Sequence, residues 1–385
     1  MNCPVCNSRE CEIFIEIYDV PVHCNILFES YNDAVNAPRS DIALTYCNSC
    51  NHVFNAAFNP DLMEYQQNYE NSLHFSPHFQ NYAENLAQRL ISAYDLHNKQ
   101  IVEIGCGKGE FLQLLCDYGN NSCTGFDPNF IQSVDSQQSK SNITFIKDFY
   151  SEKYSELDAD FIVCRHVLEH IHEPKPFIEM LLNSTGNKKD LMIYFEVPNV
   201  AFTLEKLGIW DIIYEHFSYF SIDSIRYLFN LSGFDISNLV SSFNGQYISL
   251  DAIYKSNNNL PKVNTTQFRE NIVGFTEKYN NKINSLKTKL ASYSNSDKNV
   301  VLWGAGSKGV TFLNTLKATG HIKYIVDLNP RKLRKFIPGS GQQIIGPSKL
   351  KDCDPDVVIL ANGVYHQEVK NMLHDMDIAC QLITL

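Results

Sequence analysis

The chain has 385 residues, a formal net charge of −11, and a composition with 44% hydrophobic and 19% charged residues. This length predicts two or three domains, and the composition is typical of a soluble globular protein. The acidic balance argues against nucleic acid as the main partner, because phosphate backbones bind basic surfaces. With no bilayer-length apolar run and no visible secretory signal, we expect a cytoplasmic protein that does not contact membranes.

Two C-x-x-C pairs mark residues 1–60 as a small cysteine-rich module: Cys3 with Cys6, and Cys47 with Cys50. Each pair lets two thiolates approach one ion, and four thiolates complete a tetrahedral zinc site with no position left for water. The sequence therefore predicts a structural zinc ion. Cysteines that bind no metal are the alternative.

The rest of the chain is predicted to be α/β, in three parts. Residues 61–255 begin with helices and continue as alternating strands and helices, the pattern of a parallel sheet covered on both faces. Residues 256–298 have the composition of a linker followed by a polar helix. Residues 299–385 start again with a strand, a glycine-rich loop and a helix.

The first glycine-rich loop lies in "IVEIGCGKGEF", where Glu103 ends a strand and Gly105 and Gly107 follow it. Glycines let the backbone pass close to a ligand and point amides at it. Asp127 ends the next strand, where a carboxylate can hold both ribose hydroxyls of a nucleoside. A dinucleotide-binding fold would share these features, so the loop alone leaves the nucleotide open.

The second glycine-rich loop, in "VVLWGAGSKG", has the spacing Gly304, Gly306, Gly309, and Asp327 ends the following strand. Read alone, this pattern indicates a dinucleotide enzyme. Lys308 inside the loop is atypical of that reading and suits a phosphate or pyrophosphate. Three interpretations stay open: contact with a phosphate-bearing substrate, a structural lobe, or a second dinucleotide site.

Ionisable side chains interrupt an apolar run in "IIYEHFSYFS", where Tyr214, Glu215 and His216 are adjacent. Because burying such groups is costly unless they satisfy one another, the cluster is either a structural hydrogen-bond knot or a proton-handling site. A neutral imidazole can remove a proton at cellular pH.

The strings "EIGCGKGEF", "GFDP", "RHVLEHI" and "EVPN" together resemble class I S-adenosylmethionine-dependent methyltransferases. The resemblance implies that Gly105 and Gly107 line the methionine part of the cofactor and that Asp127 holds its ribose. It places the predicted cofactor site at Glu103, Gly105, Gly107, Asp127, Asp148, Phe149 and His166.

The order of the parts resembles the NDP-sugar C-methyltransferases, which combine a zinc module, a methyltransferase domain and a C-terminal Rossmann-like domain. The resemblance implies a small-molecule substrate, a keto-deoxysugar nucleotide, bound between the last two domains of a monomer or small homo-oligomer. It implies His216 as the catalytic base, assisted by Glu215 and Tyr214. The residues predicted to contact substrate are Tyr219, Gly306, Lys308, Tyr69 and Ser76. Tyr69 and Ser76 could instead reach the methionine carboxylate of the cofactor, and Ser76 could simply begin a helix.

Two departures from that family leave the substrate open. The family's Tyr-x-Glu-His motif is one residue shorter in this chain, and its alanine-rich C-terminal loop reads "GAGSKG" here. An O- or N-methyltransferase is the alternative enzyme, since His216 could also serve it. A binding protein with an inactive core and a bifunctional enzyme with a nicotinamide site are further alternatives. In a purely structural interpretation, His216 bonds a buried carbonyl.

Overall fold

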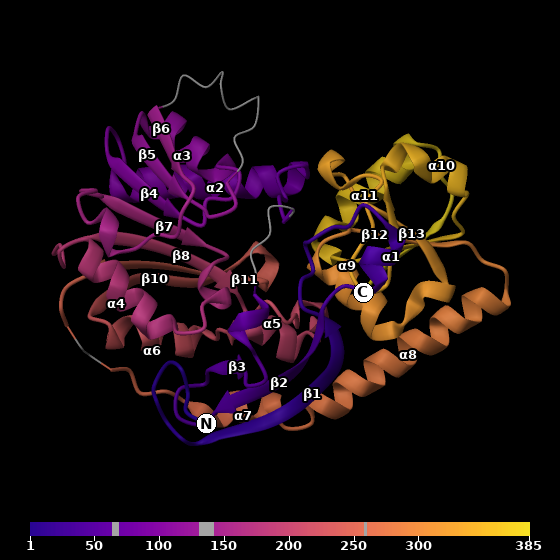
Figure 1. Ribbon diagram of the computed structural model, residues 1–385, viewed down its shortest axis with the longest axis horizontal. Helices are drawn as coiled ribbons and strands as arrows, with labels where there is room; N and C mark the ends of the chain where they lie inside the picture. The colour runs from indigo at the N-terminus through magenta and orange to yellow at the C-terminus, as the bar shows by residue number, and fades with distance from the viewer. Residues whose placement is uncertain (64–68, 131–141, 258–259) are drawn as a thin grey trace.

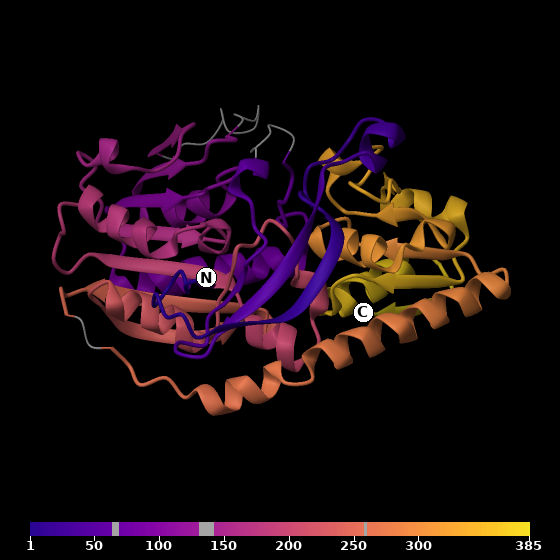
Figure 2. The ribbon, with the colours of Figure 1, turned by 60° about the horizontal axis from the view of Figure 1, so that its bottom comes forward.

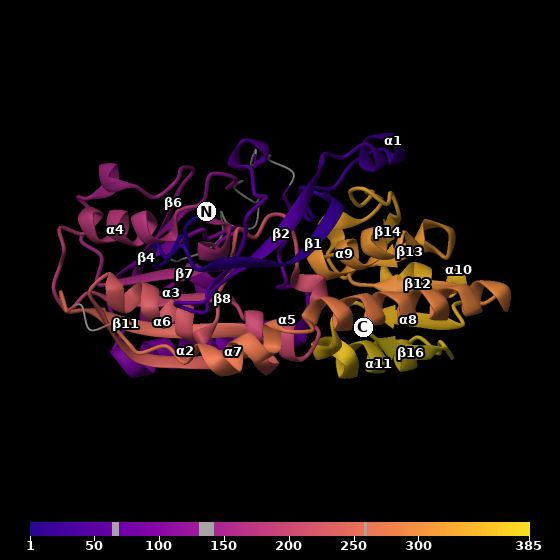
Figure 3. The same ribbon diagram turned by 90° about the horizontal axis from the view of Figure 1, so that it is seen from below.

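The computed structural model describes residues 1–63, 69–130, 142–257 and 260–385, so residues 258–259 of the predicted linker lie outside it. Figure 1 shows two α/β lobes side by side, with the N-terminal strands running along one side of both. Figures 2 and 3 show the same strands crossing from the central lobe to the C-terminal lobe. No helix within the described ranges is long and apolar enough to cross a bilayer.

The N-terminal module is an antiparallel sheet in the order β1-β2-β3-β9. Its last strand comes from a distant part of the chain, because Val53 pairs with Tyr219 and Phe54 with Ser218. The sequence on either side of residues 218–219 is thereby held against the module. The elements are β1 (Cys11–Pro21), α1 (Tyr31–Val35), β2 (Arg39–Cys47), β3 (Val53–Asn55) and β9 (Ser218–Tyr219).

The central sheet has the order β10-β11-β8-β7-β4-β5-β6. Strands β4 to β8 are parallel, whereas β11 is antiparallel to both β8 and β10. From β4 the sheet grows outward in both directions, which places a topological switch point between β4 and β7. The strands are β4 (Gln100–Ile104), β5 (Ser122–Phe126), β6 (Asn142–Ile146), β7 (Phe161–Arg165), β8 (Met192–Pro198), β10 (Phe234–Ser242) and β11 (Tyr247–Tyr254).

Helices cover both faces of this sheet (Figure 1). The longest of them begins where the Ser76 side chain accepts a hydrogen bond from the Phe79 amide, with a proline at the first helical position. Its buried residues, Phe79, Ala83, Leu86 and Leu90, recur every three or four positions, as an amphipathic helix requires. The helices are α2 (Pro77–Tyr94), α3 (Glu110–Gly119), α4 (Pro174–Ser184), α5 (Val200–Glu205) and α6 (Ile222–Leu231).

The C-terminal lobe is a parallel sheet in the order β14-β13-β12-β15-β16, with its own switch point between β12 and β15. Its central strands are apolar and fully buried, as expected for a sheet covered on both faces. The elements are α7 (Thr265–Ile272), α8 (Phe275–Asn295), β12 (Val300–Trp303), α9 (Ser307–Leu316), β13 (Ile322–Val326), β14 (Gln343–Ile345), α10 (Leu350–Cys353), β15 (Val357–Leu360), α11 (His366–Asp375) and β16 (Gln381–Thr384).

One continuous apolar core joins the N-terminal module, helix α8 and the C-terminal lobe. It contains Ile15 of β1, Phe275 of α8 and Phe312 of α9. Trp210, from the central part of the chain, packs edge-on against Phe312 with ring centroids 5.2 Å apart. The module therefore holds the two lobes together.

Candidate active site

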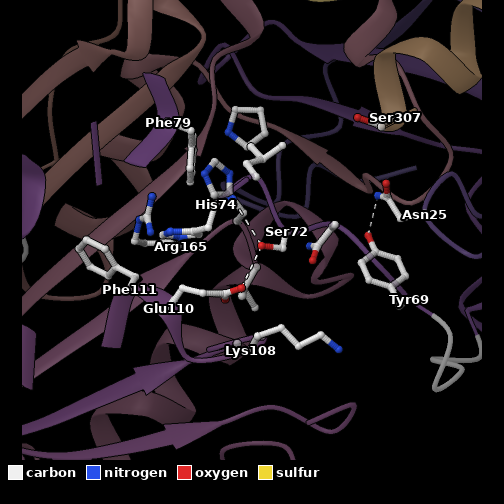
Figure 4. Close-up of a pocket in the computed structure, with 18 of the residues that line it drawn as sticks. Asn25, Tyr69, Ser72, His74, Phe79, Lys108, Glu110, Phe111, Arg165 and Ser307 are labelled. Carbon is white, nitrogen blue, oxygen red and sulfur yellow. Dashed lines mark hydrogen bonds between the residues drawn. The ribbon is translucent and has the colours of Figure 1, made fainter. Parts of the chain in front are cut away.

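The carboxyl ends of both parallel sheets open into one cavity of about 480 Å³. Residues that follow β4, β5 and β7 line one side, and residues that follow β12, β13 and β15 line the other. Ligands of open α/β sheets bind at such switch points, and here two of them face each other. The volume is within the range of small-molecule sites. Figure 4 shows the side of the cavity that the central lobe forms, with Ser307 of the C-terminal lobe opposite it.

The first glycine-rich loop needs glycine for steric reasons. Gly105 and Gly109 have φ angles of +71° and +83°. A Cβ at Gly105 would lie 2.1 Å from Val167, and one at Gly109 would lie 2.5 Å from the Phe145 ring. Above Gly107 there is open space, and this residue lines the cavity. The loop is therefore shaped to let a ligand approach its backbone.

Asp127 lies on the cavity wall at the end of β5, as predicted. Its carboxylate accepts hydrogen bonds from the amides of Gly107 (3.0 Å) and Asn129 (2.8 Å), which fix its direction. Asp148 and Phe149 line the same region. Asp148 is paired with Lys153 and accepts a hydrogen bond from Tyr154, which lower its pKa to about 2, so its charge is already compensated.

A buried network of charges forms the floor beside β7. Arg165 donates to Glu196 at 2.8 Å, and the Nε2 atom of His166 lies 3.1 Å from the same carboxylate. Burial alone would oppose protonation of His166, but hydrogen bonds to Glu169 and Glu196 outweigh it and raise its pKa to about 9. His166 therefore carries a positive charge at neutral pH, at the edge of the cavity.

Glu103, at the end of β4, lines the cavity but is only 3% exposed. Burial raises its pKa to about 8, although the nearby Arg165 opposes this shift. Glu103 is consequently protonated at neutral pH in the ligand-free chain.

His216 lines the cavity, where it was predicted to act. Its ring lies 5.0 Å from that of His170, and its Nδ1 atom is buried with no hydrogen-bond partner among the described residues. The pKa of His216 is held well below its usual value, mainly by burial. The nearby His170, His166 and Lys308 lower it further. The imidazole is therefore neutral and can accept a proton.

Tyr214 and Glu215, predicted to assist the base, do not line the cavity. The Tyr214 hydroxyl accepts a hydrogen bond from the Asn59 amide at 2.8 Å. Glu215 Oε2 accepts one from the Cys24 amide at 2.9 Å. Both partners belong to the N-terminal module, onto which strand β9 draws this segment. The structure therefore places these two side chains in the packing of the N-terminal module, and a catalytic role for them stays a prediction.

Tyr219 does not reach the cavity as a substrate ligand either. Its hydroxyl hydrogen-bonds to the backbone of Ile213, donating to the carbonyl at 2.8 Å. Its ring lies 5.7 Å from that of His216. Tyr219 therefore supports the loop that carries His216, and the predicted substrate contact needs correction.

The C-terminal glycine-rich loop repeats the geometry of the first loop with one change. Asp327 accepts hydrogen bonds from the amides of Ala305 and Asn329, both at 2.8 Å, much as Asp127 binds its own loop. Unlike Asp127, it also faces a buried lysine, Lys332, at 3.4 Å. Gly306 and Lys308 line the cavity as predicted, and Lys308 is paired with Asp211.

Tyr69 and Ser76 also line the cavity. The Tyr69 hydroxyl accepts a hydrogen bond from the Asn25 side chain at 3.2 Å (Figure 4). Ser76 caps helix α2, and its hydroxyl donates to Glu368 of the C-terminal lobe at 2.7 Å. Ser76 thus has a structural role at the cavity wall.

The four cysteines of the two C-x-x-C pairs come together, with all four sulfur atoms within 4.8 Å of one another. Cys3 and Cys50 are 3.6 Å apart, and Cys6 and Cys47 are 3.5 Å apart. Zinc–sulfur bonds of about 2.3 Å in a tetrahedron imply sulfur separations of about 3.8 Å. The donor set and its spacing fit one zinc ion.

Two family models match the chain. A "Methyltransferase domain" matches residues 77–239, and a "C-methyltransferase C-terminal domain" matches residues 258–382. The protein is a methyltransferase. A search of curated proteins found no match to it.

Solved structures similar to this methyltransferase share little sequence with it. Magnesium protoporphyrin IX methyltransferase from Synechocystis PCC 6803 is 17% identical, with a TM-score of 0.36 over 46% of this chain and 84% of its own. The 1,6-didemethyltoxoflavin-N1-methyltransferase of Burkholderia thailandensis is 13% identical, with a TM-score of 0.35 over 45% of this chain and 78% of its own. A methyltransferase from Aquifex aeolicus is 12% identical, with a TM-score of 0.33 over 46% of this chain and 98% of its own.

Several residues that line the cavity of the methyltransferase were not predicted from the sequence. Arg165 ends strand β7 inside the quoted string "RHVLEHI", so its position could have indicated it. Asn25, Asp211 and Glu368 come from parts of the chain with no motif. Only the fold brings these three to the cavity.

Proposed function

We propose that this methyltransferase C-methylates a keto-deoxysugar nucleotide bound between its two lobes. The observation that carries the proposal is the single cavity onto which the first glycine-rich loop, His216 and Lys308 all face. A sugar nucleotide needs a site for its sugar beside the methyl donor and a site for its phosphates beyond it. The match to a C-methyltransferase C-terminal domain supports transfer to carbon.

In the proposed reaction, the His216 imidazole removes a proton from the carbon next to the ketone. The electron pair of that C–H bond delocalises onto the ketone oxygen as an enolate. Protonated His166 lies at the edge of the cavity, and its positive charge, although shared with Glu169 and Glu196, would favour the enolate electrostatically. When bound, S-adenosylmethionine would supply the electrophilic methyl group, with the electron pair of its sulfur–methyl bond staying on the leaving S-adenosylhomocysteine as the enolate carbon takes the methyl.

The ligand-free cavity keeps His216 a weak base, and we propose that the substrate strengthens it. Lys308 is among the groups that lower the His216 pKa. A substrate phosphate that pairs with Lys308 would compensate this charge and raise the pKa of His216 toward the useful range. Substrate binding and proton removal are then connected through one lysine.

We further propose that the C-terminal loop holds the phosphates of the substrate and not a second dinucleotide. A ribose-binding carboxylate must have its oxygens available to two hydroxyls. Asp327 and Asp127 each accept two backbone amides, but only the Asp327 carboxylate also faces the buried ammonium of Lys332, which occupies one of its oxygens. Lys308 on the neighbouring helix turn remains at the cavity wall for a phosphate.

We also propose that Cys3, Cys6, Cys47 and Cys50 bind one structural zinc ion. Their spacing supports this, and four thiolates leave no position for water. The zinc ion would fix the start of the module whose strands join the two lobes.

Exchange of deuterium from solvent into a candidate keto-sugar nucleotide, with S-adenosylhomocysteine in place of the methyl donor, isolates the proton step. We expect His216→Asn to slow this exchange by about 100-fold or more. His172→Asn, which changes an exposed histidine outside the cavity, is the matched control and should exchange at the normal rate.

Exchange that survives in the His216→Asn variant would rule out this residue as the base. If the wild type shows no exchange into any keto-sugar nucleotide tested but methylates one of them when S-adenosylmethionine is supplied, the result would instead indicate O- or N-methylation.

A further inference from the structure

Residues 69–79, which we name the cover, lie along the cavity and touch the cofactor-binding loop. Ser72 donates a hydrogen bond to Glu110 at 2.9 Å, and Glu110 is the first residue of α3, directly after the glycine-rich loop. Figure 4 shows this bond together with His74 and Phe79 on the same wall. A ligand on that loop can therefore affect the position of the cover through this hydrogen bond.

The same cover is hydrogen-bonded to the C-terminal lobe at two points, and Arg331 of that lobe lies over the Phe75 ring. At one, the Asn329 side chain donates to Glu70 at 3.0 Å. At the other, Glu368 of α11 accepts hydrogen bonds from the Ser76 hydroxyl at 2.7 Å and the His78 amide at 3.0 Å. Glu70 is 8% exposed, so its bond to Asn329 is shielded from water.

The C-terminal partners of the cover also belong to the second ligand site. Asn329 and Glu368 line the cavity, and the Asn329 amide donates to Asp327 beside the C-terminal loop. Residues 70–75 form neither helix nor strand. Their conformation depends on the backbone hydrogen bond from Glu70 to Asn25 and on the side-chain bonds to the two lobes.

We propose that the cover couples the two ligand sites, so that a nucleotide in the C-terminal half of the cavity tightens binding of the cofactor and the reverse. Because the cover is hydrogen-bonded to both lobes, a ligand that fixes one lobe also fixes the cover, and the second ligand then meets a cover that is already in position. The coupling is reciprocal because it is a difference of binding free energies. Glu70 and Glu368 act in it as positioning residues. This inference rests on the proposed nucleotide substrate.

Titration calorimetry of the full chain measures the coupling as the ratio of two affinities for the same ligand, with and without nucleotide. The affinity for S-adenosylhomocysteine is determined alone and with saturating uridine or thymidine diphosphate. We expect the nucleotide to strengthen binding by about 10-fold, within the usual range of such couplings. In Glu368→Ala and in Glu70→Ala the ratio should fall toward one. Because it is a ratio, a uniform loss of affinity leaves it unchanged.

Gln367→Ala is the matched control, since Gln367 precedes Glu368 on the same helix and is exposed. Within the described residues, its side chain hydrogen-bonds only to Asn371. It should keep the full ratio. A wild-type ratio of one, with both ligands bound, would overturn the coupling and leave the proposed substrate intact. An unchanged ratio in both glutamate variants would also overturn it. If no nucleoside diphosphate binds the wild type, the proposed substrate class fails and the coupling fails with it.

Discussion

The Lys308 ammonium is paired with the Asp211 carboxylate across the cavity between the two lobes. Both side chains are 17% exposed and both line the cavity. Asp211 comes from the turn before the loop of His216 and lines the same cavity as His216. A phosphate that binds Lys308 must therefore compete with this carboxylate or share the lysine with it.

Removing the Asp211 charge should make the phosphate site stronger. In Asp211→Asn we expect nucleoside diphosphate affinity to rise by roughly 1 kcal/mol, about five-fold, as for a partly exposed ion pair. Calorimetry at two salt concentrations measures it, and the gain should shrink at high salt. Asp352→Asn, which removes the exposed partner of Lys349, is the matched control and should leave affinity unchanged. Weaker binding in Asp211→Asn would show that the carboxylate holds Lys308 in place for the phosphate.

Glu215 should matter for stability and not for chemistry. Glu215→Ala leaves the buried Cys24 amide without its acceptor, which costs about 1–3 kcal/mol. Urea unfolding measures this loss, while the rate of deuterium exchange per folded molecule should stay within about three-fold. Glu173→Ala, at an exposed glutamate, controls for the loss of a carboxylate. A large fall in exchange at normal stability would restore Glu215 to the catalytic group.

Zinc should be present at one ion per chain. We expect elemental analysis by mass spectrometry to find it in the wild type and to lose it in Cys47→Ser. Because structural zinc contributes on the order of 10 kcal/mol to small modules, that variant should also lose the ordered N-terminal sheet. Cys11→Ser changes a cysteine outside the four-sulfur cluster and should keep the metal. Full zinc content in Cys47→Ser would contradict the assignment.

Glu103 should make stability depend on pH. Its folded-state pKa of about 8 lies above its ordinary value of 4.5, because the side chain is buried. Between these two values the folded chain keeps a proton that the unfolded chain has lost, so this contribution to stability falls as pH rises.

The Glu103→Gln variant tests this pH dependence. Compared with wild type, it should gain stability from about pH 5 to about pH 8, by up to a few kcal/mol. Urea unfolding of the ligand-free chain across this range measures the gain. Glu156→Gln, at an exposed glutamate, should show a constant difference from wild type. A constant difference for Glu103→Gln as well would mean that Glu103 is ionised throughout.

The sequence by itself determined the α/β class, the two glycine-rich loops and the four-cysteine cluster. These features depend on short-range geometry. Gly105 must be glycine because Val167 fills the place that a side chain would take. Two C-x-x-C pairs can be predicted to share one ion because they can meet around it at many relative orientations. The strand before each loop and the carboxylate after the next strand follow from the same local pattern, so residues such as Asp127 could be placed at the site in advance.

Only the tertiary structure decided which side chains of the Tyr-Glu-His segment face the cavity. Tyr214 and Glu215 turn away because their hydrogen-bond partners, Asn59 and Cys24, lie in a module more than a hundred residues earlier in the chain. Likewise, only the tertiary structure shows that Lys308 and Asp211 form an ion pair. The free energy of burying a polar side chain depends on the partner it meets, and long-range strand pairing supplies that partner.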